Sequence, residues 1–171
     1  MKAAFTLLEL IVALLIVGVL IAIAVPVTSG FLARSRSVKC LANLRSLGMG
    51  LNLYLNENNS IMPDLAAARR SLDEDVRVID NTLDAFLDDR RVFSCPGDSG
   101  IAAKSGTSYY WNSALSGQPV GSLNFLGLVT DVTRIPVLVD KEAWHPESKD
   151  KVNHLFADGH VDKQLRLFSE P

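Results

Sequence analysis

A chain of 171 residues, once an N-terminal membrane segment is set aside, is long enough for one small domain with its own core but not for two. Its composition is 48% hydrophobic and 21% charged, which is typical of globular chains and excludes a disordered one. The net charge of −2 contains no basic surplus, so the composition does not predict a nucleic-acid partner.

The N-terminus is dominated by one apolar segment. Residues 10–27 include no charged or strongly polar side chain, and with residues 5–8 they can span about 30 Å of hydrocarbon as a helix. A secretory signal peptide would be cut near Ala22-Ile23-Ala24, but its apolar region is usually only about 7–15 residues long. A plain signal anchor explains the length but not Glu9, a carboxylate that is costly near hydrocarbon unless it has a partner.

The sequence MKAAFTLLELIVALLIVGVLIAIAVP resembles the N-terminus of type IV pilins and type II secretion pseudopilins. The resemblance covers a short basic leader, the Phe-Thr-Leu-Leu-Glu start, the apolar helix and Pro26. It implies that prepilin peptidase removes residues 1–4 by cutting between Ala4 and Phe5, and that the new amine of Phe5 is N-methylated. Ala4 departs from the glycine that the family usually has before the cut. The implied partners are other pilin-like subunits of a filament, with an assembly platform and a motor.

Glu9 acquires a role from this processing. Cleavage creates a charged amine at Phe5 in the first turn of a helix, where a carboxylate is also favourable. An amine and a carboxylate are each expensive in hydrocarbon and tolerable as a pair. The resemblance implies that Glu9 pairs with the N-terminal amine of a neighbouring subunit. The alternative is a side chain that only reaches the lipid headgroups.

The orientation in the membrane rests on two conflicting signals. Four basic residues follow the apolar run, namely Arg34, Arg36, Lys39 and Arg45. The positive-inside rule alone would keep the following domain in the cytoplasm. The resemblance implies instead a single-pass protein of the bacterial inner membrane with its head on the periplasmic or extracellular side, which later enters a filament. We follow the resemblance because the leader motif is the more specific signal.

Residues 5–26 are therefore predicted to form a transmembrane and assembly helix, and residues 27–171 an amphipathic helix with a globular head. Pro26 is expected to bend the helix. Beyond it, apolar side chains recur at three- and four-residue steps: Cys40, Leu41, Leu44, Leu47, Leu51, Tyr54 and Leu55. One helix is thus predicted to continue to about Leu55, where the asparagines of NENNS end it.

Cys40 and Cys95 are the two cysteines of the chain. Cys40 lies on the apolar stripe, so it is either a small buried apolar residue or half of a disulfide with Cys95 in an exported head. The cysteines and histidines do not have the spacing of a zinc site.

The middle of the chain predicts short helices at residues 64–76 and 80–90. The acidic run at 73–75 is interpreted as a solvated surface; the alternative is a calcium site, which would lack EF-hand spacing, and otherwise no cofactor is expected. Residues 95–121 predict a long loop with a brief aromatic strand at 109–111.

The C-terminal part predicts β-structure. Residues 134–140 read as a strand, and residues 152–168 as a hairpin with a type I′ turn at Asp158-Gly159. After the turn, Val161, Leu165 and Leu167 alternate with polar residues, and Lys163 is the exception on the apolar side. The predicted fold is α+β, a long N-terminal helix packed on a small antiparallel sheet.

A second, narrower resemblance comes from four stretches in order: CLANLRSLGMGLNLYLNENNSIMP, FSCPGD, SYYWNSAL and VNHLFADGHVD. They resemble a bacterial subfamily of prepilin-type proteins described by an H-x9-DG signature. The strict signature is absent, because the nearest histidine upstream is His145, with twelve residues between it and Asp158.

An enzyme would have to use Cys95, the C-terminal histidines and Asp158 as a hydrolase-like set. His154 and His160 could also form a metal pair across the hairpin, but spacing suggests no third ligand. The usual catalytic motifs are missing from the sequence. The prediction is therefore a pilin-like structural subunit and not an enzyme. The alternative is a secreted or membrane-anchored surface-binding domain, which an exposed groove around residues 109–111 would favour.

Overall fold

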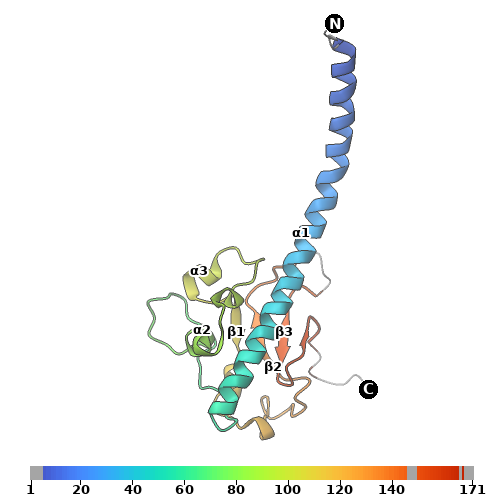
Figure 1. Cartoon of the computed structure of the whole chain (residues 1–171). Helices are drawn as coiled ribbons and strands as arrows, with labels where there is room; N and C mark the ends of the chain where they lie inside the picture. The colour runs from blue at the N-terminus through green and yellow to red at the C-terminus, as the bar shows by residue number, and fades with distance from the viewer. Residues whose placement is uncertain (1–5, 146–149, 166, 168–171) are drawn as a thin grey trace, which may run out of the picture.

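The computed structural model describes residues 6–145, 150–165 and 167. One helix, α1 (Leu7–Glu57), extends over 51 residues. Its first half stands away from the rest of the chain, and its second half lies along a head that the later residues form (Figure 1). This is the α+β arrangement that the sequence predicts, with a long helix that is apolar at its start and a small antiparallel sheet.

The second half of α1 is held to the head by its apolar stripe. The buried hydrophobic residues on this part of the helix are Cys40, Leu44, Leu47, Leu51 and Leu55. Their spacing of three and four residues puts them on one side of an α-helix. At its end, Asn59 and Ser60 take left-handed φ values of 53° and 57°. Asparagine tolerates this conformation better than most residues, so α1 stops close to the predicted end.

The helix continues without interruption through position 26. Figure 1 shows a smooth curve along α1 rather than a break. A proline removes one backbone donor from the helix, which is a common origin of curvature. A bend centred on Pro26 stays a prediction.

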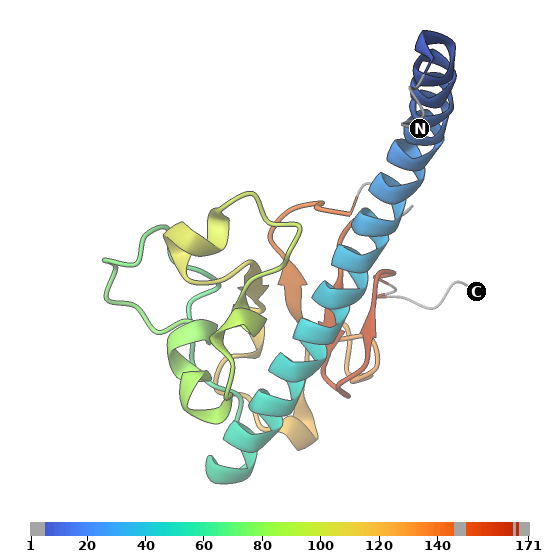
Figure 2. The same ribbon diagram turned by 45° about the horizontal axis from the view of Figure 1, so that its top comes forward.

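The head contains one four-stranded antiparallel sheet in the order β1-β2-β3-β4. Its strands are β1 (Tyr109–Trp111), β2 (Pro136–Asp140), β3 (His154–Phe156) and β4 (Val161–Asp162). The second half of α1 contacts β3 and β4, whereas α2 and α3 lie toward the β1 side of the head (Figures 1 and 2). The backbone of Gly48 comes so close to β3 that a Cβ there would lie 3.1 Å from Leu155. A larger residue at position 48 would require the Leu155 side chain to shift.

Short helices complete the head. They are α2 (Ile79–Thr82), α3 (Ile101–Ser105) and the 3₁₀ turns η1 (Asp84–Phe86), η2 (Arg90–Phe93), η3 (Ser113–Leu115) and η4 (Val120–Ser122). The core that they share with α1 and the sheet includes Trp111 and Tyr109, both buried. These two aromatics anchor the long loop on the core, while Tyr110 between them faces outward.

The helix predicted at residues 64–76 is wrong. This segment runs without helical structure because its backbone bonds to other parts of the chain. Ala66 donates to the carbonyl of Arg77 at 2.9 Å, and the carbonyl of Ala67 accepts from Trp111 at 2.9 Å. These tertiary bonds override the helix propensity of three consecutive alanines. The helix predicted at residues 80–90 is shortened to α2 and η1.

Residues 154–162 form a hairpin at Asp158-Gly159, but its turn is not of type I′. The N–H of Gly159 donates to Phe156 O at 2.9 Å, and Phe156 N donates to His160 O at 2.9 Å. Of the two turn residues only Gly159 has a positive φ, 89°, whereas type I′ needs two. The connection is a three-residue loop with a left-handed glycine at its end.

The strand expected after this turn is also shorter than predicted. β4 ends at Asp162, so the alternation up to Leu167 does not continue as a strand. Lys163 reaches back to α1, where its Nζ donates to Ser37 Oγ at 2.8 Å. This bond accounts for a lysine on the apolar side of the pattern, because its stem can cover apolar surface while its ammonium bonds to the helix.

Candidate functional site

The start of α1 is closed by a capping box between Thr6 and Glu9. The Glu9 N–H donates to Thr6 Oγ1 at 3.3 Å. In return, Glu9 Oε2 accepts from Thr6 N and from Thr6 Oγ1, both at 2.9 Å. Backbone donors in the first turn have no partner within the helix, so this exchange satisfies two groups that would otherwise stay unbonded near hydrocarbon.

Thr6 is a functional residue that the sequence interpretation missed. The signal was present, because Thr6-Leu7-Leu8-Glu9 has the T-x-x-E spacing of a capping box directly before an apolar run. Glu9 therefore has a role within its own helix in addition to the role in assembly that the resemblance implies. The predicted cleavage between Ala4 and Phe5, and N-methylation of Phe5, lie outside the described residues.

The first half of α1 has the properties of a membrane span. An 18-residue stretch is apolar and long enough to cross a membrane, judged by length and composition, and none of it is buried inside the protein. Soluble core helices that pass this test are mostly buried, so its full exposure distinguishes α1 from them. A signal sequence would pass equally well.

The second half of α1 also carries apolar side chains that face away from the head. Val38, Met49 and Leu53 are 58%, 62% and 51% exposed, and Phe31 and Leu32 precede them on the same helix. A groove beside Phe31 and Val38 is lined by α1 alone. Arg34 and Lys39 line the same groove, so this outward face of α1 combines exposed apolar side chains with cations. Large exposed apolar side chains on a helix face are typical of a contact surface.

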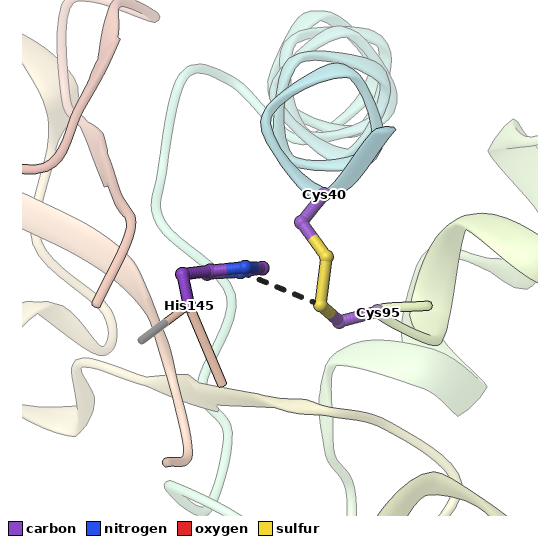
Figure 3. Close-up of side chains that lie close together, drawn as sticks. All are labelled: Cys40, Cys95 and His145. Carbon is purple, nitrogen blue, oxygen red and sulfur yellow. Dashed lines mark hydrogen bonds between the residues drawn. A yellow bond between two sulfur atoms is a disulfide. The ribbon is translucent and has the colours of Figure 1, made fainter. Parts of the chain in front are cut away.

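Where α1 meets the head, Cys40 and Cys95 form a disulfide (Figure 3). Both cysteines are buried, and the ring of His145 lies beside them, with its Nε2 3.6 Å from Cys95 Sγ. The same Nε2 is 3.5 Å from Asp140 Oδ2. The disulfide joins α1 covalently to a segment 55 residues later in the chain. A movement of the helix would therefore be transmitted to the head.

The loop that follows Cys95 is stabilised by hydrogen bonds to Asp98. The carboxylate of Asp98 accepts from the N–H groups of Gly100, Ile101 and Ala102 at 2.7–2.8 Å, and from Ser108 Oγ at 2.6 Å. Burial raises the pKa of Asp98, but these hydrogen bonds outweigh it and hold the pKa below its ordinary value. Asp98 thus caps α3 and fixes the loop on the disulfide side.

The three histidines have different surroundings. His145 lies beside the disulfide, whereas His154 is buried in β3. Burial lowers the pKa of His154, and the negative charge of Asp140 acts in the opposite direction. His160 stacks on Phe156 with ring centroids 4.3 Å apart, and its Nδ1 is 2.6 Å from Asp158 Oδ1. Among the described residues, the group able to hold a metal contains His145 with the cysteines and neither His154 nor His160. Cys95 in a disulfide offers no thiolate for a hydrolase-like reaction.

A groove of about 500 Å³ opens at Tyr110. Tyr110 is 43% exposed, and Lys141 Nζ lies 5.6 Å from the centre of its ring. The Lys141 ammonium is fixed by bonds to Ser105 Oγ and Thr107 O at 2.8 and 2.7 Å. Arg70 and Lys104 also line the groove, so cations outnumber the carboxylate of Glu142.

Comparison with known proteins agrees with the N-terminal geometry. Residues 1–25 match the family model described as the prokaryotic N-terminal methylation motif, which is the signature of type IV pilins and pseudopilins. The motif supports a pilin-like protein that is processed by prepilin peptidase, and it points to a structural subunit and not to an enzyme. With the apolar start of α1, it indicates anchoring in the inner membrane. No curated protein and no solved structure matches the chain.

Proposed function

We propose that this protein is a structural subunit of a filament of the type II secretion or type IV pilus class. The observation that carries the proposal is the methylation motif at residues 1–25, which includes the start of the exposed apolar half of α1. In this proposal α1 is stored in the inner membrane with the head on the periplasmic side. A platform and motor then move it into a filament, where contacts between helices replace contacts with lipid.

Glu9 supports assembly in this proposal through its charge. Both bonds from Thr6 end on Oε2 of Glu9, so Oε1 can accept from the N-terminal amine of a neighbouring subunit. Each charge alone in an apolar environment would cost on the order of several kcal/mol, and pairing the two charges offsets this cost.

The outward face of α1 supplies the second contact. Val38, Met49 and Leu53 are exposed in the single chain, and helices of neighbouring subunits would cover them. Fully burying one such side chain is worth about 1.5–3 kcal/mol, so three of them contribute substantially to each subunit contact. This face extends exposed apolar side chains beyond the membrane half, with Arg34 and Lys39 among them, and favours helix-to-helix packing along α1.

Processing is tested by mass spectrometry of the mature N-terminus. We expect a chain that begins with N-methylated Phe5. A mature chain that begins at Val25 would instead establish a conventional signal peptide and a secreted domain, and it would refute the proposal.

The role of Glu9 is tested by three substitutions. Glu9→Gln keeps a side chain able to complete the capping box but removes the charge, and Thr6→Val removes the cap but keeps the charge. We expect Glu9→Gln and Glu9→Ala to leave the protein in the membrane and to prevent its incorporation into filaments, while Thr6→Val assembles. If Glu9→Gln assembles normally and Thr6→Val does not, capping alone explains Glu9.

The groove at Tyr110 favours a second function, recognition of an acidic polysaccharide at the cell surface. An exposed aromatic face can stack on a sugar ring while Arg70, Lys104 and Lys141 attract its carboxylates. Polygalacturonate is a suitable probe. Tyr110→Ala and Lys104→Ala should each weaken binding about tenfold, whereas Lys151→Ala, outside this groove, should not. Equal binding by all variants would exclude the groove.

A further inference from the structure

Four buried side chains with metal-binding atoms meet beneath α1. The ligand atoms of Cys40, Cys95 and His145 lie within 4.8 Å of one another. Asp140 at the end of β2 places a carboxylate oxygen 3.5 Å from His145 Nε2 but lies outside this group of three, so it would have to shift toward the sulfurs to bind the same ion. Because the four come from α1, the loop after η2, β2 and the segment that follows β2, their spacing in the sequence does not resemble that of a zinc motif.

Two distances from His145 match those between ligand atoms of a tetrahedral metal centre. With zinc bonds of about 2.3 Å to sulfur and 2.0–2.1 Å to nitrogen or oxygen, two ligand atoms of a tetrahedron lie about 3.4–3.8 Å apart. The separations of His145 Nε2 from Cys95 Sγ and from Asp140 Oδ2 are 3.6 and 3.5 Å. The two sulfur atoms are bonded to each other in the disulfide, so they are the pair that must separate (Figure 3).

Groups around the cluster would support thiolate and carboxylate ligands. The Gly97 N–H donates to Cys95 Sγ at 3.3 Å, which stabilises negative charge on that sulfur. Asp140 Oδ2 accepts from Asn153 N at 2.9 Å and from Asn153 Nδ2 at 2.7 Å, which fixes the carboxylate. Asp140 Oδ1 is buried and has no hydrogen-bond partner among the described residues, so it is free to accept a cation if the carboxylate turns this oxygen, and not the Oδ2 held by Asn153, toward His145.

We propose that the reduced head binds one Zn²⁺ through Cys40, Cys95, His145 and Asp140, and that the disulfide and the metal site are alternative states of the same cluster. A newly made chain has reduced cysteines. In an oxidised chain, a dithiol transfers two electrons to the S–S bond, giving two Cys thiols and the disulfide of the reductant. Binding of Zn²⁺ then releases the two thiol protons. Oxidation reverses both steps and expels the metal.

The test uses the full chain in detergent, reduced with a phosphine under anaerobic conditions and titrated with Co²⁺. We expect one Co²⁺ per chain, a thiolate-to-cobalt charge-transfer band, the visible bands of a tetrahedral site, and loss of these bands on addition of one equivalent of Zn²⁺. The oxidised chain should show none of them. Circular dichroism of the same samples reports whether the reduced head stays folded.

His145→Gln and Asp140→Asn should each weaken Co²⁺ binding at least about tenfold. His160→Gln is the matched control, because its imidazole lies outside the cluster, and it should bind like the unchanged chain. Two results would overturn the proposal. One is the absence of thiolate bands in the reduced chain, folded or not. The other is equal Co²⁺ affinity in His145→Gln and the unchanged chain, which would mean that two thiols bind metal without a built site.

Discussion

Removing the disulfide should have a large and calculable effect on the stability of the head. Cys40 and Cys95 are separated by 55 residues. In the chain-entropy model, releasing a loop of this length gives the unfolded state about 14 cal/mol/K, or about 4 kcal/mol at 25 °C. Replacing both cysteines with alanine adds about 1 kcal/mol for the space that two buried sulfurs leave. We therefore expect Cys40→Ala/Cys95→Ala to lose about 5 kcal/mol.

Urea unfolding in detergent, followed by fluorescence of Trp111 and Trp144, measures this loss. At a urea dependence of about 2 kcal/mol per molar, the midpoint should fall by about 2–2.5 M. The reduced, metal-free chain is the control, since it lacks the cross-link but keeps both sulfurs. Its unfolding free energy should fall only by the chain-entropy contribution of about 4 kcal/mol. A loss below about 1 kcal/mol in the double variant would refute the argument that the loop closure stabilises the head.

Two further substitutions test the loops that frame the site. Asp98→Asn should cost about 1–3 kcal/mol at pH 7, because one amide oxygen replaces a carboxylate that accepts four bonds. The lowered pKa of Asp98 stabilises the fold above the unfolded carboxyl's pKa of about 3.9, and this contribution is lost as the pH falls through the folded value. The difference in unfolding free energy between the two proteins should therefore shrink below about pH 4; a constant difference would contradict it. Gly106→Ala should cost about 2–3 kcal/mol, since φ is 85° and a Cβ would collide with the buried Asp80–Arg69 pair. Gly117→Ala, at φ 70° with nothing within 4 Å, should cost only about 1 kcal/mol in the same thermal-unfolding assay, and equal losses would remove the collision from the explanation.

The buried pair behind Gly106 illustrates what local patterns leave open. Arg69 and Asp80 lie in segments that the sequence predicts as parts of two helices. In the structure the side chains of both form a buried ion pair, with Arg69 Nε also donating to Ser105 O at 3.2 Å. Burial raises the pKa of Asp80 against the attraction of Arg69. No periodicity in residues 64–76 predicts that Arg69 pairs with Asp80, because this contact depends on the tertiary fold.

The candidate site divides in the same way. Thr6 and Glu9 could be predicted as a capping pair from four consecutive residues, because the interaction is local. The cluster of Cys40, Cys95 and His145 could not, since three separate segments must fold before their atoms approach. The H-x9-DG spacing was no guide to it either, because His145 is three residues further from Asp158 than that signature requires.

By itself, the sequence determined the long helix, its apolar first half, the amphipathic stripe from Cys40 to Leu55, the strand at 109–111 and a strand within 134–140. Each of these depends on periodicity or on chain-local chemistry, which a linear pattern records. The tertiary structure decided the rest: the loss of the helix at 64–76, the turn type at Asp158-Gly159 and the surroundings of the disulfide. In these places, hydrogen bonds and burial between distant segments outweigh local preference by on the order of a few kcal/mol.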